Sequence, residues 1–384
     1  MFTYILVLFA VILLYLLTYD SDKSQSKGIL MCMILFLALF VGMSDMLGGY
    51  DRYIYCDLFD SLCDSVAAGI PLQETALFML YPSEFGYDTL NYIISFVTHN
   101  RYIFILIYTL IVYFLLYQSL KRQVSNYPFA VMLFLGIWFF FTFTYLRQVL
   151  AASVCWLAIK YVAERKPVKF FAIVLLAYTI HNSAIVFAPL YFLPNVKFKP
   201  WMVIAALAVC LAIGLTSLPA GLFEQYGEIT NTELRMGAME EQNTIGFRFE
   251  YLLEAVVFVT LIFFRYDRVD EQNRMELTLV NMAFVFCGIL LVFVQSQNGG
   301  RLSWYYMSGL ISTLTILATK DRRIDYYNIA LMAMSILLYL RILLAWGVQL
   351  YPYKTFLSNG HRDGDFIYEI YEYDNRYDDD KLYR

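Results

Sequence analysis

Residues 139–183 read FFFTFTYLRQVLAASVCWLAIKYVAERKPVKFFAIVLLAYTIHNS, and this stretch decides the fold. The apolar runs 128–145 and 148–162 are each long enough to cross a hydrocarbon core of about 30 Å. Only a tight turn around Arg147 separates the two runs. We therefore predict a helical hairpin that places Arg147 at one face of a membrane.

A third apolar run, 168–180, reaches His181 after about 20 Å of helix, which is short of a full crossing. His181-Asn182-Ser183 is therefore predicted to break the helix or to form a re-entrant turn. Ionisable groups within a membrane are functional candidates, because lipid does not solvate them. The alternative for His181 is a core histidine that is hydrogen-bonded to a neighbouring helix.

Apolar stretches recur along almost the whole chain of 384 residues, of which 60% are hydrophobic and 18% aromatic. This composition predicts an all-α polytopic integral membrane protein with about 12 transmembrane helices. We expect the first segment to be a retained helix, because it lacks a basic n-region and a small-residue cleavage site. The predicted helices start near Phe2, Ile29, Arg101, Pro128, Gln148, Val168, Ser183, Trp201, Phe249, Leu277, Leu302 and Ile329.

The chain is predicted to form a single transmembrane domain, residues 1–350, with large outer loops at 48–100 and 219–248. The second loop is polar and acidic and contains several glycines, which favours a mobile lid over a cavity. Residues 351–384 are rich in tyrosine and aspartate and lack apolar periodicity. We expect them to form a flexible or surface-lying tail.

Lysine and arginine are distributed unevenly between the two predicted faces. One face carries lysines such as Lys121 and Lys166 besides arginines, which makes it cytoplasmic by the positive-inside rule. The opposite face, up to residue 340, carries no lysine. Its positive charges are Arg52, Arg101, Arg147, Arg235, Arg248 and Arg301.

Arginine without lysine favours a site for an anion on the outer face. The planar guanidinium binds phosphate oxygens in pairs and stacks on aromatic rings, whereas lysine presents a point charge. Arg301 also follows two glycines, whose backbone allows an anion to approach closely. The alternative is that positive-inside selection removes lysine from outer loops more strongly than arginine. Arg341 interrupts the last apolar run about halfway along its helix, and we expect it to face a wet cavity or an acid.

Aromatic residues alternate with acids and amides in the outer loop 48–100, for example at Asp51, Tyr53 and Glu84. Sugars stack their C–H faces on such rings while their hydroxyls bond to the acids. The alternative is an interfacial tyrosine belt with solvated acids. Ser83 is predicted to cap a short helix that continues through Phe96 and fixes Glu84 in its first turn.

The sequence contains no Cys/His cluster with metal-ligand spacing and no glycine-rich phosphate-binding motif. We therefore expect neither a metal nor a cofactor. Cys56 and Cys63 would lie two helical turns apart, roughly 10 Å, which is too far for a disulfide.

Four motifs in order resemble the EpsG-like branch of the Wzy-type polysaccharide polymerases. They are Asp51-x-Tyr53-x-Tyr55, Glu84-x-Gly86-Tyr87-x-x-Leu90-Asn91, Leu146-Arg147-Gln148-x-x-Ala151 and His181-Asn182-Ser183-Ala184. The resemblance extends to about residue 320. In architecture the chain is similar to the metal-independent O-antigen polymerase and ligase group, from which the long tyrosine-rich tail departs.

The resemblance implies a metal-independent glycosyltransferase of polysaccharide biosynthesis, as for a capsule. It would transfer a growing glycan from undecaprenyl pyrophosphate onto the next lipid-linked repeat unit, at the periplasmic face of the bacterial inner membrane. Its partners would be these glycans, the lipid bilayer and a chain-length regulator, with no nucleic acid.

A departing pyrophosphate needs cationic groups, and an attacking hydroxyl needs a base. We assign Arg147 and Arg301 to the pyrophosphate, with Arg248 as a third candidate. His181 is a base or a diphosphate ligand, and Glu84 binds the acceptor or is the rival base. Asp51, Tyr53 and Arg341 complete the predicted substrate-binding set.

Two other functions remain open. A flippase for lipid-linked oligosaccharides would need cations along a path through the membrane, whereas here the arginines gather near one face. A membrane O-acyltransferase that modifies the glycan would use an intramembrane histidine with an acyl donor from the inner side. The sequence has no histidine on that side.

Overall fold

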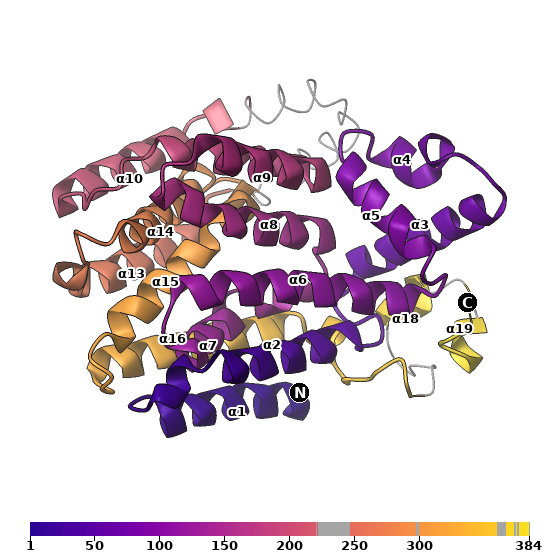
Figure 1. Ribbon diagram of the computed structural model, residues 1–384, viewed down its shortest axis with the longest axis horizontal. Coiled ribbons are helices and arrows are strands. Elements are labelled where there is room, and N and C mark those ends of the chain that lie inside the picture. Colours follow the sequence, from indigo (N-terminus) through magenta and orange to yellow (C-terminus); the bar gives the residue numbers. More distant parts are fainter. Residues whose placement is uncertain are drawn as a thin grey trace. The chain divides into compact units, whose positions relative to one another are not determined.

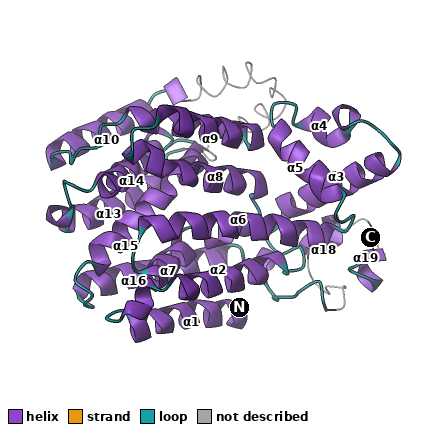
Figure 2. Cartoon of the chain, in the orientation of Figure 1, coloured by secondary structure: helices purple, strands orange, loops and turns teal. Residues whose placement is uncertain are grey.

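Helices make up nearly all of the computed structural model (Figure 1), and Figure 2 shows no strand. The structure describes residues 1–219, 221, 246–296, 299–358, 366–371, 374 and 376–383. Within these residues the only β-type pairing is an isolated bridge between Ser44 and Thr355. The predicted all-α polytopic membrane fold is confirmed.

Among the described residues, four helices are long and apolar enough to cross a membrane. They are α6 (Arg101–Gln123), α8 (Leu146–Ala163), α14 (Arg274–Val292) and α16 (Tyr326–Ala345). Shorter apolar helices are α1 (Phe2–Thr18), α2 (Lys27–Gly42), α7 (Tyr127–Ile137), α9 (Pro167–Ile180), the 3-10 helix η4 (Asn182–Phe192) and α10 (Pro200–Gly214). The two remaining predicted helices correspond to α13 (Phe249–Phe264) and to the 3-10 helix η6 (Gly299–Tyr306) followed by α15 (Met307–Thr319). Each predicted helix start lies within three residues of an observed one.

The chain divides into two compact units, of which the first comprises Met1–Leu157, Leu175–Ala184 and Ala318–Arg384. In this unit α2 packs along α6, and α7 packs against both α1 and α16. Gly136 lets α7 approach α16, because a Cβ there would lie 2.5 Å from the carbonyl oxygen of Ser335. Small residues at such contacts allow the backbones of membrane helices to pack closely.

The predicted outer loop of the first unit is largely helical. It forms α3 (Tyr50–Ala67), α4 (Ala76–Leu80) and α5 (Phe85–Ser95), and α3 packs against α4, α5 and α6. These elements group at the right of Figure 1. The short helix expected after Ser83 is present, but Glu84 is its N-cap residue.

The second unit comprises Ala158–Val174 and Ile185–Leu317. Its centre is α14, which packs against α10, α13 and η6. An apolar cavity of about 400 Å³ lies along α10 and α14. The predicted lid falls mainly on residues 222–245, which lie outside the described residues, as Arg235 does.

The predicted hairpin around Arg147 is corrected in one respect. The run 128–145 is not one helix, because α7 ends at Ile137 and the 3-10 helix η3 (Phe139–Phe143) follows. Bulky aromatic side chains and threonine lose rotamer freedom in an α-helix, which favours leaving it here. Arg147 therefore lies in the first turn of α8 instead of in a turn between two helices.

Candidate functional site

The centre of the candidate site is a buried ion pair within the first unit. Arg147 donates from Nη1 to Oε2 of Glu84, the N-cap residue of α5. The two side chains are only 4% and 3% exposed. Each charge depends on the other at this depth, because neither is solvated by water. The pair joins two motifs that lie 63 residues apart in the sequence.

The helix break at His181 supplies a further donor to this pair. Helix α9 ends at Ile180 and η4 begins at Asn182, whose backbone N–H donates to Oε1 of Glu84 at 3.2 Å. The first N–H groups of a helix lack partners within the helix and attract anions. The predicted break is confirmed, and it binds the second oxygen of the Glu84 carboxylate.

His181 lies at the edge of the same cluster, with 21% of its side chain exposed. Its Nδ1 is 3.8 Å from Oε1 of Glu84, which is too long for a hydrogen bond. The backbone N–H of Ser183 donates to this Nδ1 at 3.3 Å, and the Ser183 Oγ lies 2.8 Å from it. Because Nδ1 accepts a hydrogen bond, the neutral ring carries its proton on Nε2.

Three tyrosine rings surround the guanidinium of Arg147. Its Cζ lies 3.8 Å from the ring centroid of Tyr81 and 5.6 Å from those of Tyr55 and Tyr87. The faces of aromatic rings attract a cation, most strongly where water is excluded. These three tyrosines lie in the outer loop 48–100, whose aromatic residues were predicted to bind sugars or to form an interfacial belt. In the structure their rings pack around an arginine.

A glycine sets the distance between α5 and α9. A Cβ at Gly86 would lie 2.2 Å from Oγ1 and 3.0 Å from the carbonyl oxygen of Thr179. No other residue fits here unless one of the helices moves, because real Cβ contacts are longer. Gly86 therefore allows Glu84 to reach Asn182.

Asp88 belongs to this cluster, although the sequence analysis gave it no role. It lies one helical turn after Glu84 on α5, and its side chain is fully buried. Burial and the nearby charge of Glu84 raise the pKa of its carboxyl from 3.8 to about 7, while Arg147 acts in the opposite direction. The i, i+4 spacing from Glu84 was the signal that would have identified it.

The predicted outer arginine Arg52 binds the protein itself. It lies on α3, is 1% exposed, and donates to Ser44 Oγ at 2.9 Å. It also donates to two backbone carbonyls, those of Leu47 at 2.5 Å and Val41 at 3.0 Å. The planar guanidinium group of Arg52 therefore stabilises the turn that follows α2.

Two predicted sugar-binding residues are neighbours of Arg52 on α3. Tyr53 is buried, and its ring centroid lies 6.2 Å from that of Tyr371 in the tail. Asp51 is partly exposed in the first turn of the helix. The substrate role of both residues stays a prediction.

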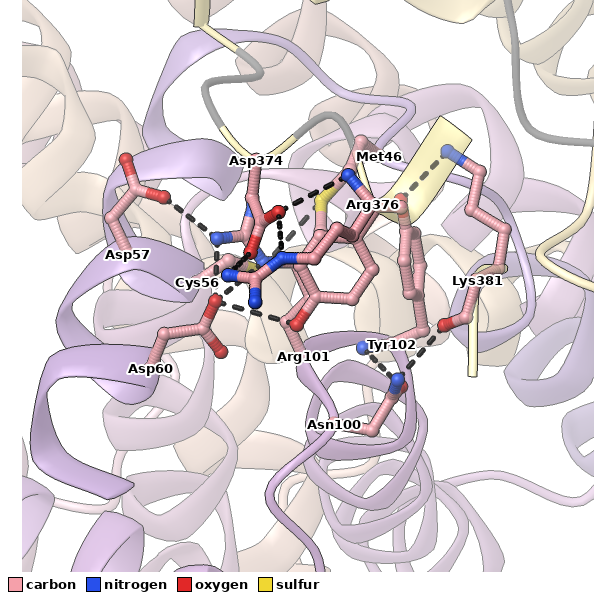
Figure 3. A network of polar contacts seen from close by, with 11 residues as sticks. Met46, Cys56, Asp57, Asp60, Asn100, Arg101, Tyr102, Asp374, Arg376 and Lys381 are labelled. Carbon is pink, nitrogen blue, oxygen red and sulfur yellow. Dashed lines mark hydrogen bonds and ion pairs between the residues drawn. The ribbon is translucent and has the colours of Figure 1, made fainter. Parts of the chain in front are cut away.

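Arg101 also binds carboxylates of the protein, as Figure 3 shows. Its Nη2 donates to Asp57 at 3.0 Å and to Asp60 at 2.5 Å, and its Nε donates to Asp60 at 2.9 Å. The Cζ of Arg101 lies 4.6 Å from the ring centroid of Tyr377. Beside this network lies a cavity of about 690 Å³, lined mainly by aspartates, serines and two arginines.

The tail beyond residue 350 contributes buried side chains to the same network. Lys381 donates to the hydroxyl of Tyr102 at 2.9 Å and pairs with Asp45 at 3.6 Å. Its own carbonyl accepts from Asn100 at 2.8 Å. The described part of the tail thus packs into the first unit instead of only lying on its surface, because the acids and tyrosines near α3 and α6 bind its basic and aromatic residues.

Arg248 and Arg301 belong to the second unit. Arg248 is the N-cap residue of α13, with its Cζ 5.9 Å from the ring centroid of Tyr251. A Cβ at Gly300, the neighbour of Arg301, would lie 2.4 Å from the Tyr251 ring. The segments that carry Arg248 and Arg301 therefore both contact Tyr251. The Cζ of Arg301 also lies 6.0 Å from the ring centroid of Trp304.

Arg341 is closer to a helix end than the sequence analysis predicted. It lies in the last turns of α16, not halfway along it, and its side chain is exposed. A long cationic side chain near a helix C-terminus reaches the interface easily and complements the helix dipole.

Within the described ranges, no group of three or more His, Cys, Asp or Glu side chains is placed to hold a metal ion. All six cysteines lie within the described residues and none of them forms a disulfide, Cys56 and Cys63 on α3 included.

These features define a polytopic helical membrane protein with a buried carboxylate–guanidinium pair beside a broken helix. The family model for the EpsG family matches residues 29–355, and the chain belongs to this family. The family indicates a glycosyltransferase-like function in membrane polysaccharide polymerisation. No curated protein and no solved structure matches the chain.

Proposed function

We propose that this protein polymerises undecaprenyl-pyrophosphate-linked oligosaccharide repeat units at the outer face of the bacterial inner membrane. The product is a surface polysaccharide, and the transfer proceeds without a metal ion. The observation that carries the proposal is the buried contact of Glu84 with Arg147 and the Asn182 N–H in a chain of the EpsG family.

Arg147 and the backbone N–H of Asn182 together form an anion site that Glu84 occupies in this structure. A carboxylate and a phosphate group accept the same bidentate hydrogen bonds from a guanidinium. We infer that the pyrophosphate of the donor takes the place of the Glu84 carboxylate. Arg147 then stabilises the negative charge that grows on the leaving pyrophosphate as the glycosidic bond breaks.

His181 is better suited to bind the diphosphate than to act as the base. Its Nδ1 accepts from the Ser183 N–H, so a neutral ring has a proton to donate at Nε2. The Nε2 proton can be donated to a phosphate oxygen, whereas Nδ1, the ring nitrogen 3.8 Å from Glu84 Oε1, is used by Ser183. Displaced from Arg147, Glu84 is free to bind hydroxyls of the acceptor glycan. Arg248 and Arg301 of the second unit remain candidates to bind the pyrophosphate in place of Arg147.

The proposal is tested by incubating the purified full-length protein, reconstituted in vesicles, with lipid-linked repeat units. We expect a ladder of products from the wild-type protein and a loss of about 10²-fold or more in rate for Arg147→Lys, as for removal of an oxyanion-hole donor. Lysine keeps the positive charge beside Glu84 but loses the planar fork. The matched control is Arg122→Lys, at an exposed position near the end of α6.

A wild-type protein that builds no ladder from its native repeat unit would exclude polymerisation. Normal activity of Arg147→Lys would instead show that Arg147 only anchors the fold, and would move the pyrophosphate role to Arg248 and Arg301. Unchanged activity in the presence of a chelator is expected, and its loss would contradict the metal-independent step.

A further inference from the structure

Asp88 is an acid whose side chain is buried in the first unit. Its side chain is fully buried, and neither carboxyl oxygen has a partner among the described residues. A buried carboxyl without hydrogen bonds costs free energy, more so when it is ionised. We expect such a carboxyl group to be retained where it binds a ligand or takes part in proton transfer.

The charged groups that act on Asp88 are Glu84 and Arg147, and aromatic residues from several elements surround this pair. Glu84 lies one turn earlier on the same helix, and Arg147 lies on α8. Tyr55 on α3 and Tyr81 before α5 line the same guanidinium, and Tyr108 on α6 packs on Tyr87 at a centroid distance of 6.3 Å. His181, which follows the end of α9, is a titratable neighbour of Glu84.

The two bases that the sequence suggests have other roles. Both are engaged in this structure, and Glu84, once the donor displaces it from Arg147, is proposed to bind hydroxyls of the acceptor glycan. Both oxygens of Glu84 accept hydrogen bonds, one from Arg147 and one from Asn182. The Nδ1 of His181 accepts from Ser183. A general base needs a lone pair that is free to take a proton, and the two carboxyl oxygens of Asp88 meet this condition.

We propose that Asp88 is the general base that takes the proton from the attacking hydroxyl of the acceptor glycan. This role rests on the proposed glycosyl transfer. The hydroxyl oxygen bonds to the anomeric carbon of the donor glycan while the bond from that carbon to the pyrophosphate oxygen breaks. The electron pair leaves with undecaprenyl pyrophosphate, and the hydroxyl proton passes to the Asp88 carboxylate and later to water.

The surroundings of Asp88 suit this step. Two carboxylates one helical turn apart in a buried site resist being ionised together, so Glu84, which Arg147 neutralises, keeps its charge while Asp88 holds a proton more readily. The pKa of about 7 at Asp88 lies near neutral pH, where a base both accepts a proton and releases it. Asp88 lies one helical turn after Glu84 on α5, so the donor that displaces Glu84 from Arg147 binds beside it.

The test measures the rate of ladder formation from about pH 5.5 to about pH 8.5, on either side of the raised pKa. The reconstituted full-length wild-type protein is compared with Asp88→Asn, Asp88→Glu and the control Asp64→Asn, an exposed residue of α3. For the wild type we expect the rate to rise through about pH 7, because the ionised carboxylate is the active form. Asp88→Asn should lose about 10²-fold to 10⁴-fold and the pH step with it. Asp64→Asn should behave as the wild type does.

Asp88→Glu keeps the carboxyl but moves it, so the pH step should persist at a shifted value. A wild-type ladder together with full activity and an unchanged pH profile of Asp88→Asn would overturn the role of Asp88 and leave the polymerase proposal intact. If Asp88→Asn does not fold, Asp88→Glu decides, and a pH profile identical to that of the wild type would overturn the role. A wild-type protein that makes no ladder removes both proposals together.

Discussion

Removing one member of the Glu84–Arg147 pair should destabilise the first unit far more than removing both. In this structure each side chain is almost inaccessible to water and is neutralised by the other. The informative variants are Glu84→Gln, Arg147→Met and the double variant. Each single variant leaves one buried charge without its partner, whereas the double variant leaves none.

The expected magnitude follows from the depth of the pair. Breaking a buried pair from one side typically costs about 3–5 kcal/mol, whereas exchanging both partners for uncharged groups is often nearly neutral. Arg147→Met also loses the contact with the Tyr81 ring at 3.8 Å, which is worth about 2 kcal/mol when desolvated. Glu84→Gln keeps an amide oxygen that can accept from the Asn182 N–H. Its destabilisation therefore comes mainly from leaving the buried guanidinium of Arg147 without a carboxylate. The two single costs should therefore exceed the double cost by about 2 kcal/mol or more.

The assay is denaturant unfolding of the purified protein in micelles. Tryptophan fluorescence reports it, since the rings of Trp138 and Trp156 lie 4.4 Å apart beside η3 and on α8. The control pair is Asp64→Asn with Arg122→Met, two exposed sites for which changes within about 0.5 kcal/mol are expected. Single and double changes that simply add would refute the reasoning, because they would show that the two charges do not depend on each other.

Gly86→Ala should lower the free energy of unfolding by about 1–3 kcal/mol and reduce ladder formation, because the added Cβ would press on Thr179. Wild-type values in both the unfolding and the rate measurements would contradict the close approach of α5 to α9. Asp88 binds its proton more tightly in the folded state, so its contribution to stability is complete below about pH 4 and is lost as the pH rises through about 7. The midpoint of unfolding of the wild type should therefore fall between about pH 6 and pH 8 relative to that of Asp88→Asn, and parallel curves would count against the raised pKa. Tyr377→Ala should destabilise the region around Arg101, since it removes a ring 4.6 Å from the guanidinium; unchanged protease sensitivity of the tail would show that this contact does not hold it.

The positions of the helices could be predicted from the sequence, because apolar runs of helical length have few alternatives in a membrane. The break at His181 was predictable for the same reason, since a polar tripeptide ends a run that is too short to cross. The end of α7 at Ile137 was not, because apolar composition continues through residues 138–145 and only the packing of the aromatic side chains ends the helix there.

The partners of the charged residues could not be predicted from the sequence. Glu84 reaches the Asn182 N–H because Gly86 lets α5 approach α9, and a spacing of 63 residues gives no indication that Glu84 also contacts Arg147. Asp88 was overlooked because its importance comes from full burial and from oxygens that lack partners, and neither property is visible in a polar loop sequence. The burial of Tyr377 and Lys381 in the tail was not predictable for a similar reason, since these residues are buried against Arg101, Asp45 and Tyr102.

The lack of lysine on the predicted outer face has more than one physical cause. Arg52 uses its fork on two backbone carbonyls and a hydroxyl, and Arg101 uses its fork on two aspartates, so both need arginine for reasons of structure. Arg147 differs because its acceptor is a single carboxylate that also binds the Asn182 N–H. A phosphate group can accept from the same donors that bind this carboxylate, whereas the carbonyls around Arg52 belong to the backbone of the turn that it holds. Arg147 is therefore the strongest candidate to bind the pyrophosphate, because its acceptor, the Glu84 carboxylate, can be exchanged for a phosphate group.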